Sequence, residues 1–117
     1  MSEPRLNDFL GHILQAVERI QQYNVCMDCT AFLEDTLTQD AVIRNFENIG
    51  EASRNIERRY PDFAVAHPEL PLALAYEMRN RLAHGYFDIN LEIVWKTIEN
   101  QLPGLHSRVS AALRSLL

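Results

Sequence analysis

The sequence predicts an all-α fold, and three features of it support this prediction. Apolar residues recur every three or four positions along most of the chain, as on the buried face of an amphipathic helix. Alternating β-branched runs bounded by Asn-Gly or Asp-Gly turns do not occur. Only 4 Gly and 5 Pro interrupt the 117 residues. We therefore expect an up-and-down antiparallel bundle of four main helices with short connections.

The first predicted helix carries an apolar stripe that steps alternately by four and three residues: Leu6, Leu10, Ile13, Val17 and Ile20. Pro4 suits the first turn of this helix, because the missing N–H would have no intrahelical partner there. The pattern fades around Tyr23 and Asn24. The segment from Thr30 to Leu37 is predicted to be either a brief helix or an irregular link.

The second predicted helix has a stripe with the same spacing: Val42, Phe46, Ile49, Ser53, Ile56 and Tyr60. Thr38 is a suitable N-cap, and Asp40 would lie in the first turn, where the helix dipole favours an acid. Pro61 is predicted to end the helix. Residues 61–71, which contain two further prolines, are then expected to form a connection.

Two more helices are expected in the remainder of the chain. Leu74, Met78 and Leu82 predict a third helix from about Pro71 to His84, with Gly85 as its C-cap residue. Asn90 would cap a fourth helix with the longest stripe: Leu91, Trp95, Ile98, Leu102, Leu105, Val109, Ala112 and Leu116. Pro103 lies within this stripe and has no N–H to donate. We expect a kink there, or two abutting helices with Pro103 near the start of the second.

Length and composition indicate one soluble domain, residues 1–117, that has a core without metal or disulfide staples. No apolar run approaches the ~20 residues that span a bilayer, and the N-terminus lacks a hydrophobic signal core. These features predict a cytoplasmic protein that does not enter a membrane. Four helices around one core leave some apolar stripe uncovered, which favours a homodimer.

The charges are distributed unevenly along the chain. Residues 1–40 hold seven acids and two bases, which accounts for the whole net charge of −5. The remaining residues are balanced, and ten of the eleven bases in the chain are Arg, which suits bidentate phosphate contacts. The overall acidity argues weakly against binding of nucleic acid. Because the excess of acids lies in residues 1–40, any phosphate site is expected in the second part of the chain.

The segment from Glu77 to Tyr86 is the best candidate for chemistry, because it holds two Arg, one Asn, one His and one Tyr within eight positions and no acid from position 78 to position 87. His84 is suited to proton transfer near neutral pH, and Arg79 to holding a phosphate. Asn80 shares a helix face with His84. Arg79 and His84 lie about 140° apart on a regular helix, so they share a site only if the helix ends or deforms nearby. The alternative is a helix end with ordinary surface charges.

These residues also carry a resemblance. The stretch from Arg79 to Tyr86 resembles the R-x-x-x-x-H-x-Y motif of HEPN-domain proteins, specifically the HepT-type toxins. The stretches 47–52, 93–95 and 102–103 also resemble segments of that family, so the resemblance extends over roughly residues 5 to 112. It implies a helical homodimer with the motif at a cleft between the subunits. It also implies a metal-independent ribonuclease that needs no cofactor and acts on tRNA or mRNA.

The resemblance further implies a partner, the minimal nucleotidyltransferase MntA, which acts as the antitoxin of a type VII toxin–antitoxin pair. MntA transfers AMP onto the Tyr of the motif, here Tyr86. An AMP group at this position would place a negative phosphate where the phosphate of RNA should bind. Alternatively, the Tyr86 ring packs over the end of the helix.

RNA supplies its own nucleophile in the 2′-OH, so a metal-free enzyme needs a proton carrier and a cation at the reacting phosphate. His84 is the candidate for the first role and Arg79 for the second, with Asn80 orienting either group. Arg81 would add positive potential for RNA, and Arg54, Arg58 and Arg59 on the second predicted helix would extend that surface.

Glu51 is the candidate for pairing with Arg79 or Arg81, and its alternative is a plain surface carboxylate. Two other functions stay open from the residues. A non-catalytic helical subunit would bind a nucleotide or a substrate for a partner nucleotidyltransferase. Cys26 and Cys29 form a C-x-x-C pair, typical of redox or zinc sites, but no second pair accompanies it. We therefore predict no metal.

Overall fold

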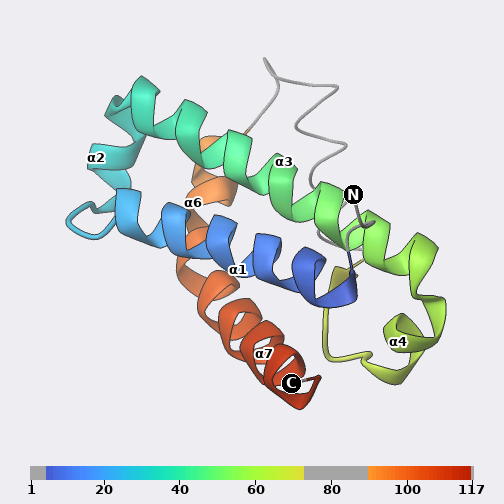
Figure 1. Ribbon diagram of the computed structural model, residues 1–117. Coiled ribbons are helices and arrows are strands. Elements are labelled where there is room, and N and C mark those ends of the chain that lie inside the picture. The colour runs from blue at the N-terminus through green and yellow to red at the C-terminus, as the bar shows by residue number, and fades with distance from the viewer. Residues whose placement is uncertain (1–4, 73–89, 117) are drawn as a thin grey trace.

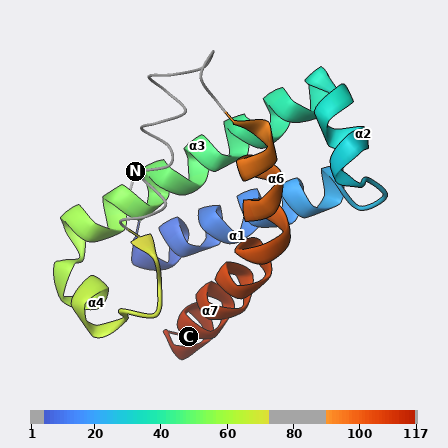
Figure 2. The same cartoon turned by 180° about the vertical axis from the view of Figure 1, so that it is seen from behind.

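The computed structural model describes residues 5–72 and 90–116, and regular structure within these two ranges is entirely helical, as predicted. The helices occur in the following order: α1 (Leu6–Tyr23), α2 (Cys29–Glu34), α3 (Thr36–Arg59), α4 (Pro61–Ala66), α6 (Leu91–Asn100) and α7 (Leu102–Ser115). Long helices α1 and α3 lie side by side, and α7 packs against α1 (Figure 1). Figure 2 shows α6 and α7 on the side of the α1–α3 pair that faces away in Figure 1.

The pair of α1 and α3 forms the centre of the core. The predicted stripe of α1 is confirmed, since Leu10, Ile13, Val17 and Ile20 are fully buried. α3 buries the predicted residues Val42, Phe46, Ile49, Ser53 and Ile56. The two helices run antiparallel, because the Arg59 guanidinium at the end of α3 lies 5.7 Å from the centre of the Phe9 ring near the start of α1.

The segment from Thr30 to Leu37 was predicted to be either a brief helix or an irregular link, and most of it belongs to the brief helix α2. Asp28 caps it, and its side chain accepts a hydrogen bond of 2.8 Å from the Ala31 N–H. A helix of six residues has too few internal hydrogen bonds to be stable alone. Its buried Phe32 meets Trp95 of α6, with ring centres 5.4 Å apart. Packing against α6 therefore supports this helix.

The predicted N-cap of the second long helix is wrong. α3 begins at Thr36 and is capped by Asp35, while Thr38 lies inside its first turn. Asp35 Oδ1 accepts from the Thr38 N–H at 3.0 Å, and the Thr38 hydroxyl donates to Oδ2 at 2.8 Å. A carboxylate can accept both bonds at once, which makes Asp35 the better cap. These bonds from Thr38 lower the pKa of Asp35.

Replacing Asp35 with Ala should lower the free energy of unfolding at pH 7, because α3 loses its cap. The folded-state pKa of Asp35 is lowered, so this stabilisation is present above the ordinary value of 3.8 and is lost as the pH falls through the folded value. Urea unfolding of the wild type and the variant should therefore converge in acid. The exposed carboxylate Glu99 on α6 offers a control, and Glu99→Ala should have little effect at either pH. A gap between Asp35→Ala and the wild type that persists in acid would contradict this origin of the effect.

The region after α3 differs from the expected plain connection. α3 ends before Pro61 as predicted, but Pro61 then begins the short helix α4. Proline is well tolerated in the first turn of a helix, so it ends one helix and begins the next here. The chain then turns through His67, and the side chains of Leu70 and Leu72 are buried in the core.

The C-terminal helices confirm two predictions. Asn90 caps α6, where its side-chain oxygen accepts from the N–H groups of Glu92 and Ile93 at 3.0 and 3.3 Å. The stripe is split rather than kinked, since α6 ends at Asn100 and α7 carries Pro103 in its first turn. Among the described residues, α4 is the helix that was not expected, and the count of four main helices stays a prediction. The third predicted helix falls mostly on residues 73–84, outside the described residues.

Across the described residues, no helix has the length and apolarity needed to cross a lipid bilayer.

Candidate functional site

The motif that was predicted to carry the chemistry lies in residues 73–89, outside the described residues. This applies to every catalytic, modification and supporting residue of that motif: Arg79, Asn80, Arg81, His84 and Tyr86. The described structure fixes the chain on both sides of the motif. Leu72 is buried in the core on one side, and Asn90 caps α6 on the other. The site can therefore be built from the remaining candidates, which lie on α3.

The outer face of α3 brings together the three other predicted site residues. Glu51, Arg54 and Arg58 are separated by three and four positions, so they form one line along the helix. All three are exposed, and the opposite face of α3 is buried against α1. The Glu51 carbonyl accepts a hydrogen bond of 3.0 Å from the Asn55 side chain. The structure therefore places these three candidates on one exposed surface of α3, and their roles stay predictions.

The two arginines of this face are available for an anion. Ion pairs within the described ranges join His67 to Glu69 and His106 to Glu18, and neither Arg54 nor Arg58 takes part in one. Two exposed guanidinium groups one helical turn apart can each contact a phosphate of an RNA strand.

Arg44 extends the same exposed face and was missed by the sequence reasoning. It lies seven residues before Glu51, which returns it to the same side of α3 after two turns. The signal that could have found it is the same periodicity that placed Arg54 and Arg58. Arg59 was also expected on the RNA-binding surface, but its guanidinium lies over the Phe9 ring of α1 instead.

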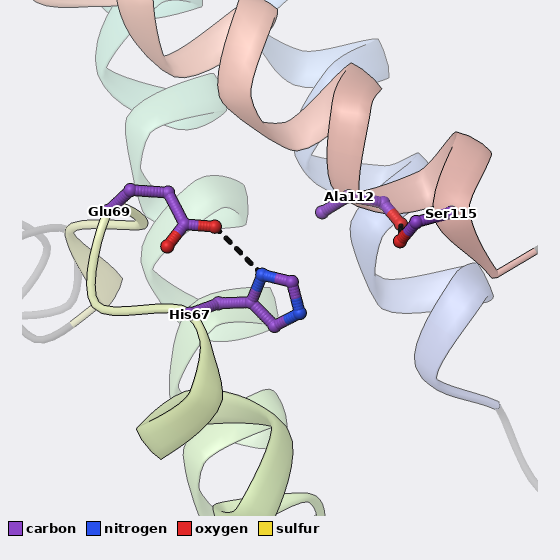
Figure 3. Close-up of polar contacts among 4 residues, drawn as sticks. All are labelled: His67, Glu69, Ala112 and Ser115. Carbon is purple, nitrogen blue, oxygen red and sulfur yellow. Dashed lines mark hydrogen bonds and ion pairs between the residues drawn. The ribbon is translucent and has the colours of Figure 1, made fainter.

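A histidine–carboxylate pair that the sequence did not single out lies after α4. His67 Nδ1 is 2.7 Å from Glu69 Oε1, as Figure 3 shows, and the His67 ring stacks 4.2 Å from that of Phe63. The hydrogen bond with His67 lowers the pKa of Glu69. In the same view, the Ser115 hydroxyl donates to the Ala112 carbonyl at the end of α7, at 2.6 Å. The hydrogen bond between His67 and Glu69 links the two ends of the turn that leads toward the motif.

Comparison with known proteins identifies the family. The family model described as "Ribonuclease HepT-like" matches residues 13–112, which is most of the chain. This chain belongs to the HepT-like family. The predicted resemblance to HepT-type HEPN proteins is therefore confirmed. The matched region includes both the exposed face of α3 and the segment from Arg79 to Tyr86.

Two relatives give the family match further support. The probable ribonuclease HepT of Thermococcus cleftensis is 40% identical over 103 residues, covering 86% of this chain and 89% of that protein. A Methanocaldococcus jannaschii protein named as a putative RNase is 37% identical, covering 88% of this chain and 83% of its own length. No solved structure gives a significant match to this HepT-like chain.

The C-x-x-C pair of this HepT-like chain remains as two free thiols. Cys26 is exposed and Cys29 is half-buried. In the part of the chain that the structure describes, no group of three or more His, Cys, Asp or Glu side chains is arranged to hold a metal ion. Among the described residues, therefore, no further side chain joins Cys26 and Cys29 to form a zinc site.

Proposed function

We propose that this chain is a metal-independent endoribonuclease that acts as the toxin of a type VII toxin–antitoxin pair. It would act in the cytoplasm, as a homodimer of one HEPN-like domain over residues 1–117, and would cleave tRNA or mRNA. The observation that carries the proposal is the family match, because it includes the sequence Arg79 to Tyr86. The name of the Thermococcus cleftensis relative, a probable ribonuclease, supports the same activity.

In the proposed reaction the 2′-OH of RNA attacks the adjacent phosphorus atom. The 5′-oxygen of the next nucleotide leaves, so the products carry a 2′,3′-cyclic phosphate and a 5′-hydroxyl. One proton must leave the 2′-OH and one must reach the 5′-oxygen. His84 is the group suited to these transfers near neutral pH. A two-fold dimer would bring two motifs together, so that one His84 acts as the base and the other as the acid.

The arginines of the site would act on the phosphate. Arg79 would bind the scissile phosphate and stabilise the charge that develops on its oxygens. Asn80 would orient Arg79 or His84 by hydrogen bonding, and Arg81 would add positive potential beside them. Glu51 on α3 would pair with one of these two arginines and fix its position.

Tyr86 would be the point of control. A partner nucleotidyltransferase of the MntA type would transfer AMP to the Tyr86 hydroxyl, with pyrophosphate leaving from ATP. The added phosphate is negative and bulky, so it would repel and exclude the RNA phosphate from the same cleft.

Cleavage of RNA in EDTA tests the proposed function directly. The purified chain is first checked by intact mass, so that only protein without AMP on Tyr86 is used. We expect cleavage of bulk tRNA or of an mRNA in EDTA at the rate seen with Mg²⁺, with cyclic phosphate ends on the products. Absence of cleavage by the unmodified chain on both RNAs would overturn the ribonuclease proposal and favour a non-catalytic nucleotide-binding subunit.

The exposed arginines of α3 give a prediction about RNA binding. Replacing both Arg54 and Arg58 with Ala should weaken binding of single-stranded RNA, because two phosphate contacts are lost. The slope of log K against log salt should become shallower by about 1.4, since each phosphate contact with a single strand contributes about 0.7. Fluorescence anisotropy over a salt series measures this slope.

The matched control for this prediction is Arg114, an exposed arginine near the end of α7. Arg114→Ala should leave the slope unchanged. An Arg54→Ala/Arg58→Ala variant with the wild-type slope would exclude this face of α3 from the RNA path.

A further inference from the structure

One end of the molecule combines exposed apolar side chains with negative charge. We call residues 23–40 the acidic end: they comprise the last residue of α1, the turn after it, α2 and the start of α3. Figures 1 and 2 both show these segments gathered at the same end of the bundle. Within the described ranges, four of the seven large apolar residues that are exposed belong to it: Tyr23, Val25, Leu33 and Leu37. Val25 and Leu37 are the most open of the four, with 78% and 81% of their surface exposed.

The charge of this end has one sign only. From position 20 to position 43 the sequence contains four acids and no Lys, Arg or His. The acids are Asp28, Glu34, Asp35 and Asp40. Two of these carboxylates cap α2 and α3, which fixes their negative charges at the surface of this end.

The acidic end also contains a buried acceptor that lacks a donor. Asn24 is only 7% exposed, and its Nδ2 donates to the Ile20 carbonyl at 2.7 Å. Its Oδ1 is buried and accepts no hydrogen bond. A buried polar atom without a partner is costly in a folded protein. The cost of this atom lies inside the fold, while the surface of the acidic end presents exposed apolar side chains and negative charge.

We propose that the acidic end is a docking surface for a basic partner protein. The partner would present an amphipathic helix whose apolar stripe packs on Leu33 and Leu37 and whose flanking Lys or Arg residues meet the carboxylates. Exposed apolar patches with a charged rim are typical of protein interaction sites. The proposal concerns a surface apart from Arg54 and Arg58, and it does not depend on ribonuclease activity.

Charge argues against the two other possible occupants. The backbone of RNA is negative, so the acidic end repels it. A second copy of this chain would bring the same patch onto itself in a two-fold interface, and like charges would then face each other. A partner of opposite charge is the occupant that covers the exposed apolar side chains and meets the carboxylates of this end with charge of the opposite sign.

The test uses the full chain, labelled with ¹⁵N, and a synthetic helical peptide of Leu and Lys with an apolar stripe. Its twin, in which Glu replaces every Lys, has the same stripe and the opposite charge. We expect the Lys peptide to shift the amide signals of residues 23–40 in a salt-dependent manner, and the Glu peptide to have no effect. Because the readout is binding, failure here leaves the cleavage test of the proposed function unaffected.

Two variants make the test specific. Leu33→Ala combined with Leu37→Ala should weaken binding of the Lys peptide by at least about tenfold, which corresponds to about 1.4 kcal/mol. Val65 on α4 is as exposed as Leu37, at 81%, and Val65→Ala should bind the peptide as the wild type does. Far-UV circular dichroism establishes that each variant keeps its helices.

Several outcomes would overturn the proposal. One is that the Lys peptide shifts amide signals outside residues 23–40. Another is that the Leu33→Ala/Leu37→Ala variant binds the Lys peptide with the affinity of the wild type. Shifts of the same amides by an RNA oligonucleotide would assign the surface to RNA. Shifts that grow with protein concentration in the absence of peptide would assign it to a second copy of the chain.

Discussion

Replacing His84 with Ala should lower the rate of RNA cleavage in EDTA by about 10²- to 10⁴-fold, the usual contribution of general acid–base catalysis. His84 is the only group within the proposed motif whose unperturbed pKa lies near neutral pH. Arg79 and Arg81 stay charged at any working pH, and so they cannot exchange a proton with the 2′-OH. The measurement is the initial rate on tRNA or mRNA, with the product ends identified.

The control for His84 is another histidine of the same chain. His12 is exposed on α1, and its ring contacts that of Phe9 edge-on. His12→Ala should therefore cleave RNA at nearly the wild-type rate. If His84→Ala retains wild-type cleavage while remaining free of contaminating nuclease, His84 is not the proton carrier. If both variants and the wild type are inactive, the non-catalytic binding subunit becomes the better description.

The positions of the long helices could be predicted from apolar spacing because one face of each helix is buried. Leu10 and Val17 on α1 and Ile56 on α3 are all fully buried, as the four-and-three stepping requires. The cap of α6 was also predictable, since Asn90 directly precedes the apolar stripe.

The start of α3 was not predictable in the same way. Asp35 and Thr38 are both good N-cap residues, and spacing alone does not rank them. The choice depends on whether the residues between them join the helix, which in turn depends on how α2 packs. α4 was missed for a related reason: Pro61 both stops a helix and suits the first turn of another.

In the candidate site, too, residues on a regular helix could be placed from the sequence, and contacts that depend on a turn could not. Glu51, Arg54 and Arg58 could be placed on one face because they belong to a long regular helix. The bond between His67 and Glu69 could not be predicted, since it depends on the turn that follows α4 rather than on any period. The geometry of the motif and the homodimer stay predictions, because spacing along a chain does not determine how a helix end folds or which surface meets a second copy.

Replacing Phe32 with Ala should destabilise the protein by about 3–5 kcal/mol, the usual cost of removing a large buried aromatic side chain. Phe32 is the only buried residue of α2, and none of its surface is exposed. Its ring packs against Trp95, so it connects this six-residue helix to α6. Urea unfolding, with all variants at one protein concentration, measures the loss.

The matched control for Phe32 is its neighbour Leu33, because it lies in the same helix but has 38% of its surface exposed. Leu33→Ala removes apolar atoms without opening a closed cavity, and it should cost less than about 1 kcal/mol. A large difference between the two variants means that burial at the α2–α6 contact, and not helix propensity, holds α2 in place. Equal losses would mean that burial of Phe32 does not hold α2 in place, and the Asp28 carboxylate, which caps α2, would be the next group to replace. The acidic end would then depend on that carboxylate for its shape as well as for its charge.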